Sequence, residues 1–240
     1  MVKIRKSQLL SKSLVAFTTP RSLISEQYRT LRTNINFSSA DQDIKSIVIT
    51  SAAHSEGKST TAVNLAIVYA QEGKKVLLID GDMRKPTMHH TFSVKNSIGL
   101  TNVLVRQNTL ETAIKATGIE NLDLITSGPI PPNPVELLGS KTLKGMLSRL
   151  KETYAVVIVD TPPILAVADA QIWANLSDGT ILVINSGTTV KEEAMKAKEA
   201  IAASNSRLIG AVLNNYKLPQ NNYSEYYEIS ENQKLLHIDD

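Results

Sequence analysis

The sequence predicts an α/β fold, in which a doubly wound, mostly parallel sheet carries helices on both faces. Short apolar runs rich in β-branched residues recur along the 240 residues, and runs without polar alternation are typical of strands buried on both faces. Helical stretches lie between these runs, and that alternation is typical of doubly wound folds. With 42% hydrophobic and 20% charged residues, the chain can bury a full core.

The expected strands and helices alternate along the chain. The strands are the apolar runs at 47–49, 76–79, 122–125, 156–159, 181–184 and 208–213, and the helices cover about 24–36, 58–72, 139–152, 167–175 and 190–204. Gly73 is expected to end the second helix, because glycine adopts the left-handed conformation that often follows a helix. The periodicity stops near Lys217.

Composition divides the chain into three parts. Residues 1–20 are predicted to be a basic, flexible N-terminal arm, 21–216 a single domain, and 217–240 a flexible C-terminal tail that contains tyrosines. The arm could contact anionic lipid or an acidic partner, or it could simply be solvated. No nucleic-acid recognition motif accompanies its basic residues, so a nucleic-acid partner is not expected.

Several kinds of site are excluded by composition. The chain contains no cysteine, which excludes disulfides, thiolate zinc sites and cysteine-held iron–sulfur clusters and suits a reducing cytoplasm. No apolar run approaches the roughly 18 residues needed to span a bilayer, and the N-terminus lacks the apolar core of a signal peptide. We therefore expect a cytoplasmic protein, which would reach the inner face of the membrane only if a partner takes it there.

A phosphate-binding loop follows the first strand and precedes a helix. The segment Ala52-Ala53-His54-Ser55-Glu56-Gly57-Lys58-Ser59-Thr60 matches a P-loop with alanine in place of the first glycine. Its backbone N–H groups would form an anion nest at the helix N-terminus, Lys58 would reach the β- and γ-phosphates, and the Ser59 hydroxyl would ligate Mg²⁺. A chance Gly-Lys-Ser at a helix start is the alternative. The context favours ATP and Mg²⁺ binding by a fold of the P-loop NTPase type.

Acidic residues end two further strands. Asp160 follows the strand 156–159, as in a Walker B element, while Asp80 and Asp82 follow the strand 76–79. A single strand-end carboxylate such as Asp80 could equally cap a helix. Acids at both strand ends, beside a P-loop, favour a metal and acid–base site. Asn214, just after the last strand, is a candidate contact for adenine.

These motifs together resemble the bacterial tyrosine kinases (BY-kinases), in the form of the cytoplasmic kinase subunit of the Gram-positive two-protein type. The resemblance rests on the P-loop, the segments 80–87 and 160–163 and a tyrosine-rich C-terminus. It implies that residues 21–216 are a P-loop kinase domain and that Lys58 and Ser59 carry the Walker A roles. Further roles follow for the acids: Asp160 is the Walker B acid, Asp80 and Asp82 form the additional Walker A′ motif, Asp82 joins Ser59 and Asp160 in holding Mg²⁺, and Asp80 faces the incoming tyrosine hydroxyl.

The resemblance also implies how the protein is regulated and with what it assembles. The motif Glu26-x-x-Arg29-x-x-Arg32 would join subunits into a ring, and Tyr223, Tyr226 and Tyr227 would be autophosphorylated. The implied partners are a transmembrane activator, protein-tyrosine substrates and a cognate tyrosine phosphatase, in the control of capsule or exopolysaccharide synthesis. Without the resemblance, Glu26 and Arg29 would be read as a solvated intrahelical pair worth ~0.2–0.5 kcal/mol.

One departure from the family pattern and two rival functions remain open. Many relatives carry Pro-Gly where this chain has His54-Ser55, so Ser55 would bear some strain if its φ is positive. A MinD- or ParA-like P-loop ATPase is the nearest rival, but such ATPases carry a signature lysine at the position of Ala53. A non-catalytic subunit that binds nucleotide only to regulate assembly is the other rival.

Overall fold

A single mixed sheet forms the centre of the molecule. The computed structural model describes residues 13–38 and 43–217, and the strands in these ranges are β1 (Ser46–Ser51), β2 (Val76–Asp80), β3 (Ile114–Ala116), β4 (Leu122–Ile125), β5 (Val156–Asp160), β6 (Gly179–Asn185) and β7 (Leu208–Asn214). Their order across the sheet is β3-β4-β2-β5-β1-β6-β7. Every pairing is parallel except that of β3 with β4. The predicted fold class is therefore confirmed.

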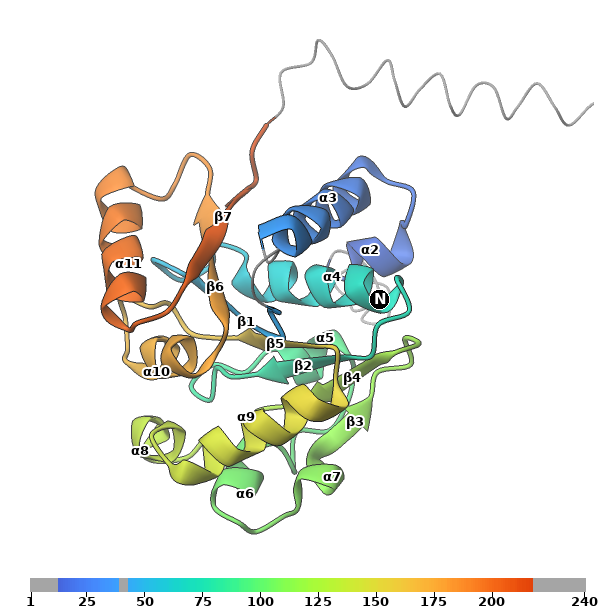
Figure 1. The fold of residues 1–240 in the computed structure, drawn as a ribbon, viewed down its shortest axis with the longest axis vertical. Helices are drawn as coiled ribbons and strands as arrows, with labels where there is room; N and C mark the ends of the chain where they lie inside the picture. The colour runs from blue at the N-terminus through green and yellow to red at the C-terminus, as the bar shows by residue number, and fades with distance from the viewer. Residues whose placement is uncertain (1–12, 39–42, 218–240) are drawn as a thin grey trace, which may run out of the picture.

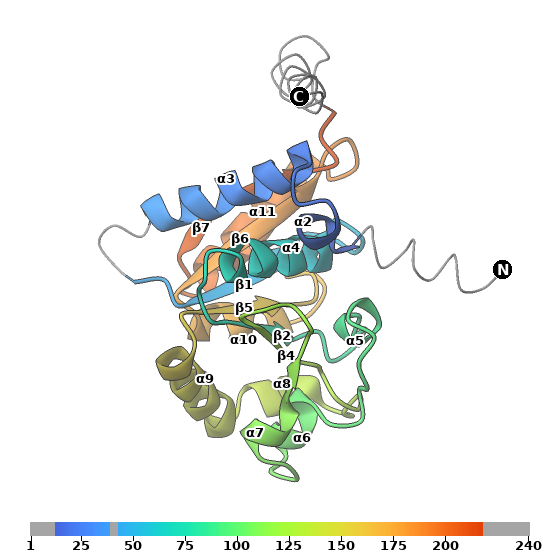
Figure 2. The ribbon, with the colours of Figure 1, turned by 90° about the vertical axis from the view of Figure 1, so that its right-hand side faces the viewer.

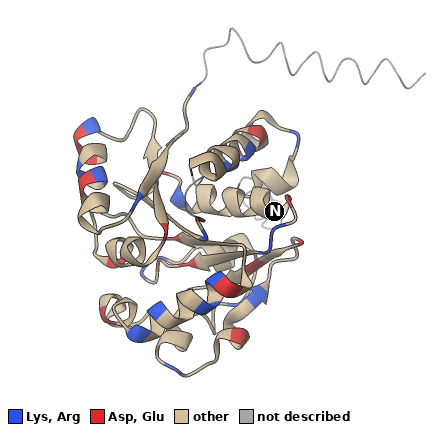
Figure 3. Cartoon of the chain, in the orientation of Figure 1, with Lys and Arg blue, Asp and Glu red and all other residues tan. Residues whose placement is uncertain are grey.

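Helices cover both faces of this sheet (Figures 1 and 2). They are α2 (Val15–Thr18), α3 (Leu23–Ser38), α4 (Lys58–Ala70), α5 (Met88–Thr91), α6 (Leu100–Leu104), α7 (Leu110–Ala113), α8 (Pro134–Leu138), α9 (Lys141–Thr153), α10 (Asp169–Leu176) and α11 (Lys191–Ala203). The helices α2, α3 and α4 pack on one face, and α6 to α11 pack on the other. Charged side chains gather on the outer helices α3, α9 and α11 (Figure 3). No helix in the described ranges is long and apolar enough to cross a bilayer.

The central strands are buried on both faces, as their unalternating sequences predict. All five residues of β2 are buried. Leu78 packs into the core beneath α4, while its neighbour Leu77 packs into the core on the opposite face. Successive side chains of a strand point to opposite faces, so a strand covered on both sides needs apolar residues at every position.

Short elements and one helix boundary differ from the prediction. The helix expected over 139–152 is α9, which begins two residues later, and Gly139 and Ser140 separate it from the short helix α8. The hydroxyl of Ser140 accepts the Leu143 N–H at 3.3 Å and so caps α9. The strand β3 and the short helices α2, α5, α6, α7 and α8 were not predicted, because three to five residues carry too little periodicity to be detected.

The packed domain begins before the predicted boundary at residue 20. Helix α2 lies within the range predicted to be a flexible arm, yet its Ala16 is fully buried. The Ala16 N–H donates to Asn64 Oδ1 at 2.8 Å, and Gln71 Nε2 donates to the Ala16 carbonyl at 2.9 Å. The boundary was therefore wrong by several residues. The remaining part of the arm, 1–12, lies outside the described residues.

The topology gathers three strand ends at one edge. The strand order reverses at β1, which lies between β5 and β6, and ligands of open α/β sheets bind at the carboxyl ends of strands at such a switch point. Ile49 of β1 is paired with Asp160 of β5, and Asp160 is in turn paired with Asp80 of β2. The loops that leave these three strands are therefore neighbours.

Candidate active site

The phosphate-binding loop has the backbone of an anion-binding turn. Helix α4 begins at Lys58, directly after Gly57, which has a φ of 96°. Ser55 has a φ of 62°, so the sequence-based concern about strain at this position is justified. The Lys58 side chain is only 8% exposed. Burial lowers the pKa of Lys58, and the nearby carboxylates of Asp160, Asp82 and Glu56 oppose this shift.

The end of strand β7 holds this loop in place. Asn214 Nδ2 donates to the carbonyl of Glu56 at 3.0 Å. A Cβ atom placed on Gly57 would lie 2.0 Å from that same nitrogen, so any side chain at Gly57 would displace the Asn214 amide and would be strained at this φ. Asn214 also lines a cavity of about 410 Å³ between α3 and β7, together with Ile24, Tyr28 and Leu31.

Glu56 braces the loop from inside, a role that the sequence did not reveal. Its side chain is buried, and its Oε2 accepts the Ala53 N–H at 2.9 Å. Its Oε1 accepts a hydrogen bond from the Thr189 hydroxyl, which in turn accepts the Asn185 N–H at 2.8 Å. Only the Glu56 backbone is left to contact a phosphate. Thr189 is 133 residues away in the sequence, so no local pattern signals this contact.

Asp160 lies beside the start of α4. Its Oδ2 accepts the Ser59 hydroxyl at 2.6 Å. Burial is the main cause that raises the pKa of Asp160 to about 7, while the Ser59 hydrogen bond and the Lys58 ammonium act in the opposite direction. Its other oxygen, Oδ1, is buried and has no hydrogen-bond partner among the described residues.

Asp80 is buried completely and uses one of its two oxygens within the protein. Its Oδ2 accepts the N–H groups of Thr87 and Met88 at 3.1 and 3.0 Å, at the start of α5. The alternative that Asp80 caps a helix is therefore correct for this oxygen. Its Oδ1 is buried without a partner in the described part of the chain. Burial, with Asp160 as the next contributor, raises the pKa of Asp80 well above the usual range.

Asp82 follows two residues later in a tight turn. Its Oδ1 accepts the backbone N–H groups of Arg84 and Lys85 at 3.1 and 2.9 Å. Asp82 is close enough to affect the pKa values of Lys58, Asp80 and Asp160. The structure therefore brings together all four residues predicted to be catalytic.

The oxygens gathered here fit a magnesium ion. Mg²⁺ prefers carboxylate and hydroxyl oxygens and usually takes only one or two ligand side chains, with phosphates and waters completing its shell. The unpaired Asp160 Oδ1 and the Ser59 hydroxyl are such oxygens. Within 13–38 and 43–217, no three His, Asp or Glu side chains form a metal cage, so a Mg²⁺ ion here would also need ligands from phosphate or water.

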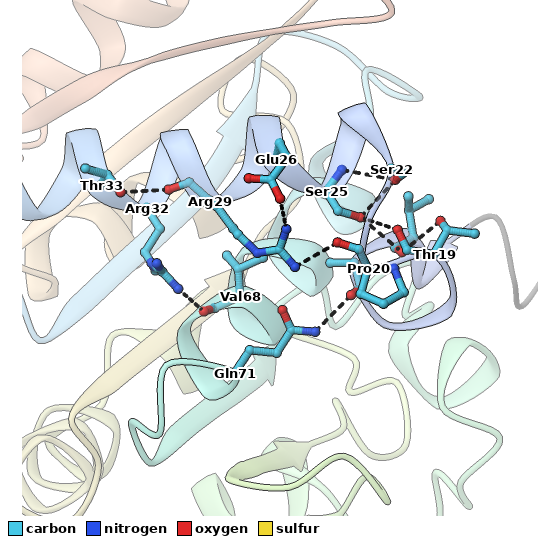
Figure 4. A network of polar contacts seen from close by, with 12 residues as sticks. Thr19, Pro20, Ser22, Ser25, Glu26, Arg29, Arg32, Thr33, Val68 and Gln71 are labelled. Atoms are coloured by element: carbon cyan, nitrogen blue, oxygen red, sulfur yellow. Dashed lines mark hydrogen bonds and ion pairs between the residues drawn. The ribbon is translucent and has the colours of Figure 1, made fainter. Parts of the chain in front are cut away.

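The predicted interface residues lie on α3, away from this cluster, and contact their own chain (Figure 4). Arg29 pairs with Glu26, one helical turn earlier, and its Nη2 donates to the Pro20 carbonyl at 2.8 Å. Arg32 Nη1 donates at 2.6 Å to the carbonyl of Val68. That carbonyl is among the last four of α4, which lack partners within the helix. Arg32 therefore fastens α3 to the end of the phosphate-loop helix.

The three tyrosines predicted to be autophosphorylated, Tyr223, Tyr226 and Tyr227, lie outside the described residues.

The strand, turn and helix around Lys58, with two acidic strand ends beside them, define a P-loop nucleotide-binding protein.

Comparisons with known proteins identify the family. A family model described as an AAA domain matches residues 44–194. The chain is 55% identical over 223 residues to the tyrosine-protein kinase YwqD of Bacillus subtilis, covering 93% of this chain and 94% of that protein. It is 44% identical over 208 residues to the putative tyrosine-protein kinase CapB of Staphylococcus aureus, covering 87% and 90%. The chain belongs to the bacterial tyrosine-protein kinase family.

Solved structures agree with this assignment and separate it from the nearest rival. The crystal structure of the chimerical protein CapA2B2 aligns with a TM-score of 0.83 and 45% identity, covering 86% of this chain and 91% of that one. MinD of Pyrococcus horikoshii, solved with Mg-ADP, aligns with a TM-score of 0.63 and 25% identity, covering 77% and 76%. The relation to the MinD ATPases is therefore distant.

The close approach of Gly57 to Asn214 gives a test of the loop geometry. We expect Gly57→Ala to weaken ATP binding at least tenfold, because its Cβ would push Asn214 away and its φ disfavours alanine. Gly145→Ala is the control, since a Cβ there meets nothing within 4 Å. Isothermal titration calorimetry measures the affinities, and equal ATP affinity in Gly57→Ala and the wild type would contradict this geometry.

Proposed function

We propose that this chain is an ATP-dependent protein-tyrosine kinase that autophosphorylates Tyr223, Tyr226 and Tyr227. The observation that carries the proposal is the paired acidic strand ends, Asp80 and Asp160, in register beside the phosphate loop. A P-loop ATPase needs only one such acid. Membership of a tyrosine-kinase family favours the use of the second acid on a tyrosine hydroxyl.

Nucleotide binding is assigned to the loop and its neighbours. The backbone N–H groups of 55–60 and the Lys58 ammonium would neutralise the phosphates. Ser59, Asp82 and Asp160 would hold Mg²⁺, which supplies charge neutralisation for phosphoryl transfer when it is bound. The adenosine end would occupy the cavity between α3 and β7, because Asn214 lines that cavity and also contacts the loop. A volume of about 410 Å³ is sufficient for a nucleoside.

Asp80 would act on the acceptor hydroxyl. A tyrosine near pKa 10 and an ordinary carboxylate near 4 differ by about 6 units, or roughly 8 kcal/mol for complete proton transfer before phosphate moves. Burial raises the pKa of Asp80, which narrows this gap. In a loose transition state Asp80 need only orient the hydroxyl and accept its proton late. The unpaired Oδ1 is the atom suited to receive it.

The tail is long enough to reach an active site. Fourteen residues separate Leu213, at the end of β7, from Tyr227, and a fully extended stretch of that length spans up to ~50 Å. The length of the tail therefore forbids neither self-phosphorylation nor phosphorylation of a neighbouring subunit. Phosphates added beside the acidic residues of the tail would favour its release from the site by like-charge repulsion.

The cellular role follows from the family resemblance. The chain would act in the cytoplasm at the inner face of the membrane, recruited by a transmembrane activator. It would control capsule or exopolysaccharide synthesis by phosphorylating protein tyrosines, with a cognate tyrosine phosphatase opposing it. The chimerical protein CapA2B2 is similar to this chain over 86% of its length, which favours a two-protein system.

Subunit contacts are assigned to Glu26, Arg29 and Arg32. The side chains of Arg29 and Glu26 are 29% and 40% exposed and so remain available to a neighbour. Arg32 is less exposed, at 17%, and its bond to the Val68 carbonyl gives it a role within the subunit as well. Replacement of Arg32 would therefore destabilise the subunit by about 1–2 kcal/mol and confuse any test of assembly.

The central test is phosphotyrosine formation. The full chain is incubated with Mg·ATP, with and without a peptide from the cytoplasmic tail of a candidate activator, and probed for phosphotyrosine. We expect a signal that increases with the peptide and disappears when Tyr223, Tyr226 and Tyr227 are all changed to phenylalanine. The absence of phosphotyrosine under both conditions would refute the kinase proposal and leave a nucleotide-dependent ATPase or assembly regulator.

Two variants separate binding from chemistry in the same assay. Lys58→Ala should lose both ATP affinity and phosphotyrosine, because the phosphates lose their buried cation. Asp80→Asn should lower the rate at least a hundredfold while ATP affinity stays within about threefold, because its role is confined to the acceptor. Full activity in Asp80→Asn would remove that role.

Assembly is tested best at Glu26, whose side chain pairs with Arg29 on the same helix. Glu26→Arg should convert the ring to monomers, as measured by multi-angle light scattering, because like charges would then face one another across the contact. Thermal unfolding should shift little, since an exposed pair contributes less than about 1 kcal/mol. Thr33→Ala, on an exposed position of the same helix, is the control. An unchanged ring in Glu26→Arg would argue against this interface.

A further inference from the structure

An ion pair between an exposed arginine and a buried carboxylate joins the turn that carries Asp82 to helix α10. Arg84 Nε donates to Asp169 Oδ2 at 2.9 Å, and Arg84 Nη2 donates to Asp169 Oδ1 at 3.0 Å. The carboxylate of Asp169 is 0% exposed, whereas the Arg84 side chain is 39% exposed. Two parallel bonds of this kind fix the orientation of both groups. The residues are 85 positions apart, so no local pattern signals the pair.

The position of Arg84 makes this pair relevant to the acids of the site. Asp82 Oδ1 accepts the Arg84 backbone N–H at 3.1 Å, so the residue that Asp169 anchors also holds the Asp82 carboxylate. Between them, the Met83 side chain is fully buried. The turn is thus held at Met83 by packing and at Arg84 by the ion pair.

Helix α10 touches the same turn at a second point. Trp173 lies one helical turn after Asp169. A Cβ atom placed on Gly81 would lie 2.9 Å from Trp173 Nε1 and 2.8 Å from the Asp160 carbonyl. The Gly81 N–H also donates to that carbonyl at 2.8 Å. One face of α10 therefore packs along the turn that follows β2, and the same turn is bonded to the end of β5.

The cost of this ion pair argues for a purpose beyond stability. Removing a carboxylate from water costs several kcal/mol, and replacing a buried ion pair with apolar residues is often neutral or stabilising. The first turn of α10 favours a negative charge at Asp169, but only by about 0.3–1 kcal/mol at ordinary sites. The two parallel bonds fix the orientation of the Arg84 side chain, and they thereby fix the position of the turn that carries it.

We propose that Asp169 is a positioning residue that sets the place of Asp82 relative to Asp160 and the phosphate loop by holding Arg84. It touches neither nucleotide nor acceptor, and it acts through Arg84 alone. The proposal rests on the kinase function proposed above. It predicts that loss of the pair slows phosphoryl transfer while ATP still binds, because Lys58 and the loop backbone lie on a different segment.

The experiment compares four variants of the full chain. Asp169→Asn keeps the shape of the side chain but removes the charge, and Arg84→Lys keeps the charge but loses the two-bond fork. Arg84→Ala combined with Asp169→Asn tests whether the two residues act as a unit. Arg149→Ala is the matched control, because it breaks the exposed pair with Glu111, in which the two side chains are 67% and 65% exposed.

Two readouts are taken for each variant. The first is the split between kcat for phosphotyrosine formation and the dissociation constant for ATP. The second is the emission of Trp173, the only tryptophan of the chain, which reports the packing of α10 against Gly81 without any nucleotide. We expect kcat to fall at least tenfold in Asp169→Asn and Arg84→Lys, with a shifted Trp173 emission and with the affinity for ATP, measured without Mg²⁺, within threefold of the wild type. The double variant should be no slower than Asp169→Asn, and Arg149→Ala should match the wild type.

Other outcomes overturn the proposal in distinct ways. Unchanged kcat in folded Asp169→Asn and Arg84→Lys would show that the pair positions nothing. A loss of kcat that only follows the loss of folded protein by circular dichroism would reduce the pair to a structural role. If the wild type itself forms no phosphotyrosine, the kinase proposal fails, and the Trp173 emission alone decides: an unchanged spectrum in both single variants would overturn the positioning role.

Discussion

The parallel pairing of β5 with both β1 and β2 determines where the two buried acids of the site, Asp80 and Asp160, lie. The register places Asp160 beside Ile49 on one side and beside Asp80 on the other. A shift of one residue in either pairing would move a carboxylate to the opposite face of the sheet. The cores above and below the sheet hold these strands in register, because each strand is apolar on both faces.

The burial of two carboxylates at this site is unfavourable, and hydrogen bonds from the surrounding chain offset part of that cost. Asp80 and Asp160 are buried near one another, and burial raises both pKa values. Each uses one oxygen in a hydrogen bond within the protein and keeps the other unpaired. Unpaired buried oxygens are unfavourable in the protein alone, and they are what a bound cation or an acceptor hydroxyl would satisfy. The kinase proposal gives each of them a partner.

The extent of sequence-based prediction depended on whether a feature is local. The phosphate loop, the acids after β2 and β5 and the doubly wound sheet could be predicted, because a contiguous motif or a long apolar run carries each of them. The inward bond of Glu56 to Thr189 and the pair of Arg84 with Asp169 could not, since both join distant segments. Helix α2 and strand β3 were missed because elements of three or four residues show no periodicity. The tail tyrosines remain a prediction.

The phosphate loop after β1 and Asp160 at the end of β5 are expected to act together on one Mg·ATP. Calorimetric titration of ATP with and without Mg²⁺ tests this directly in Asp160→Asn, with Asp123→Asn as the control because Asp123 pairs with Tyr154 instead. We expect Mg²⁺ to tighten ATP binding at least tenfold in the wild type and in Asp123→Asn. In Asp160→Asn that gain should largely disappear, because the ion loses a carboxylate ligand. A gain of the same size in Asp160→Asn would contradict the account.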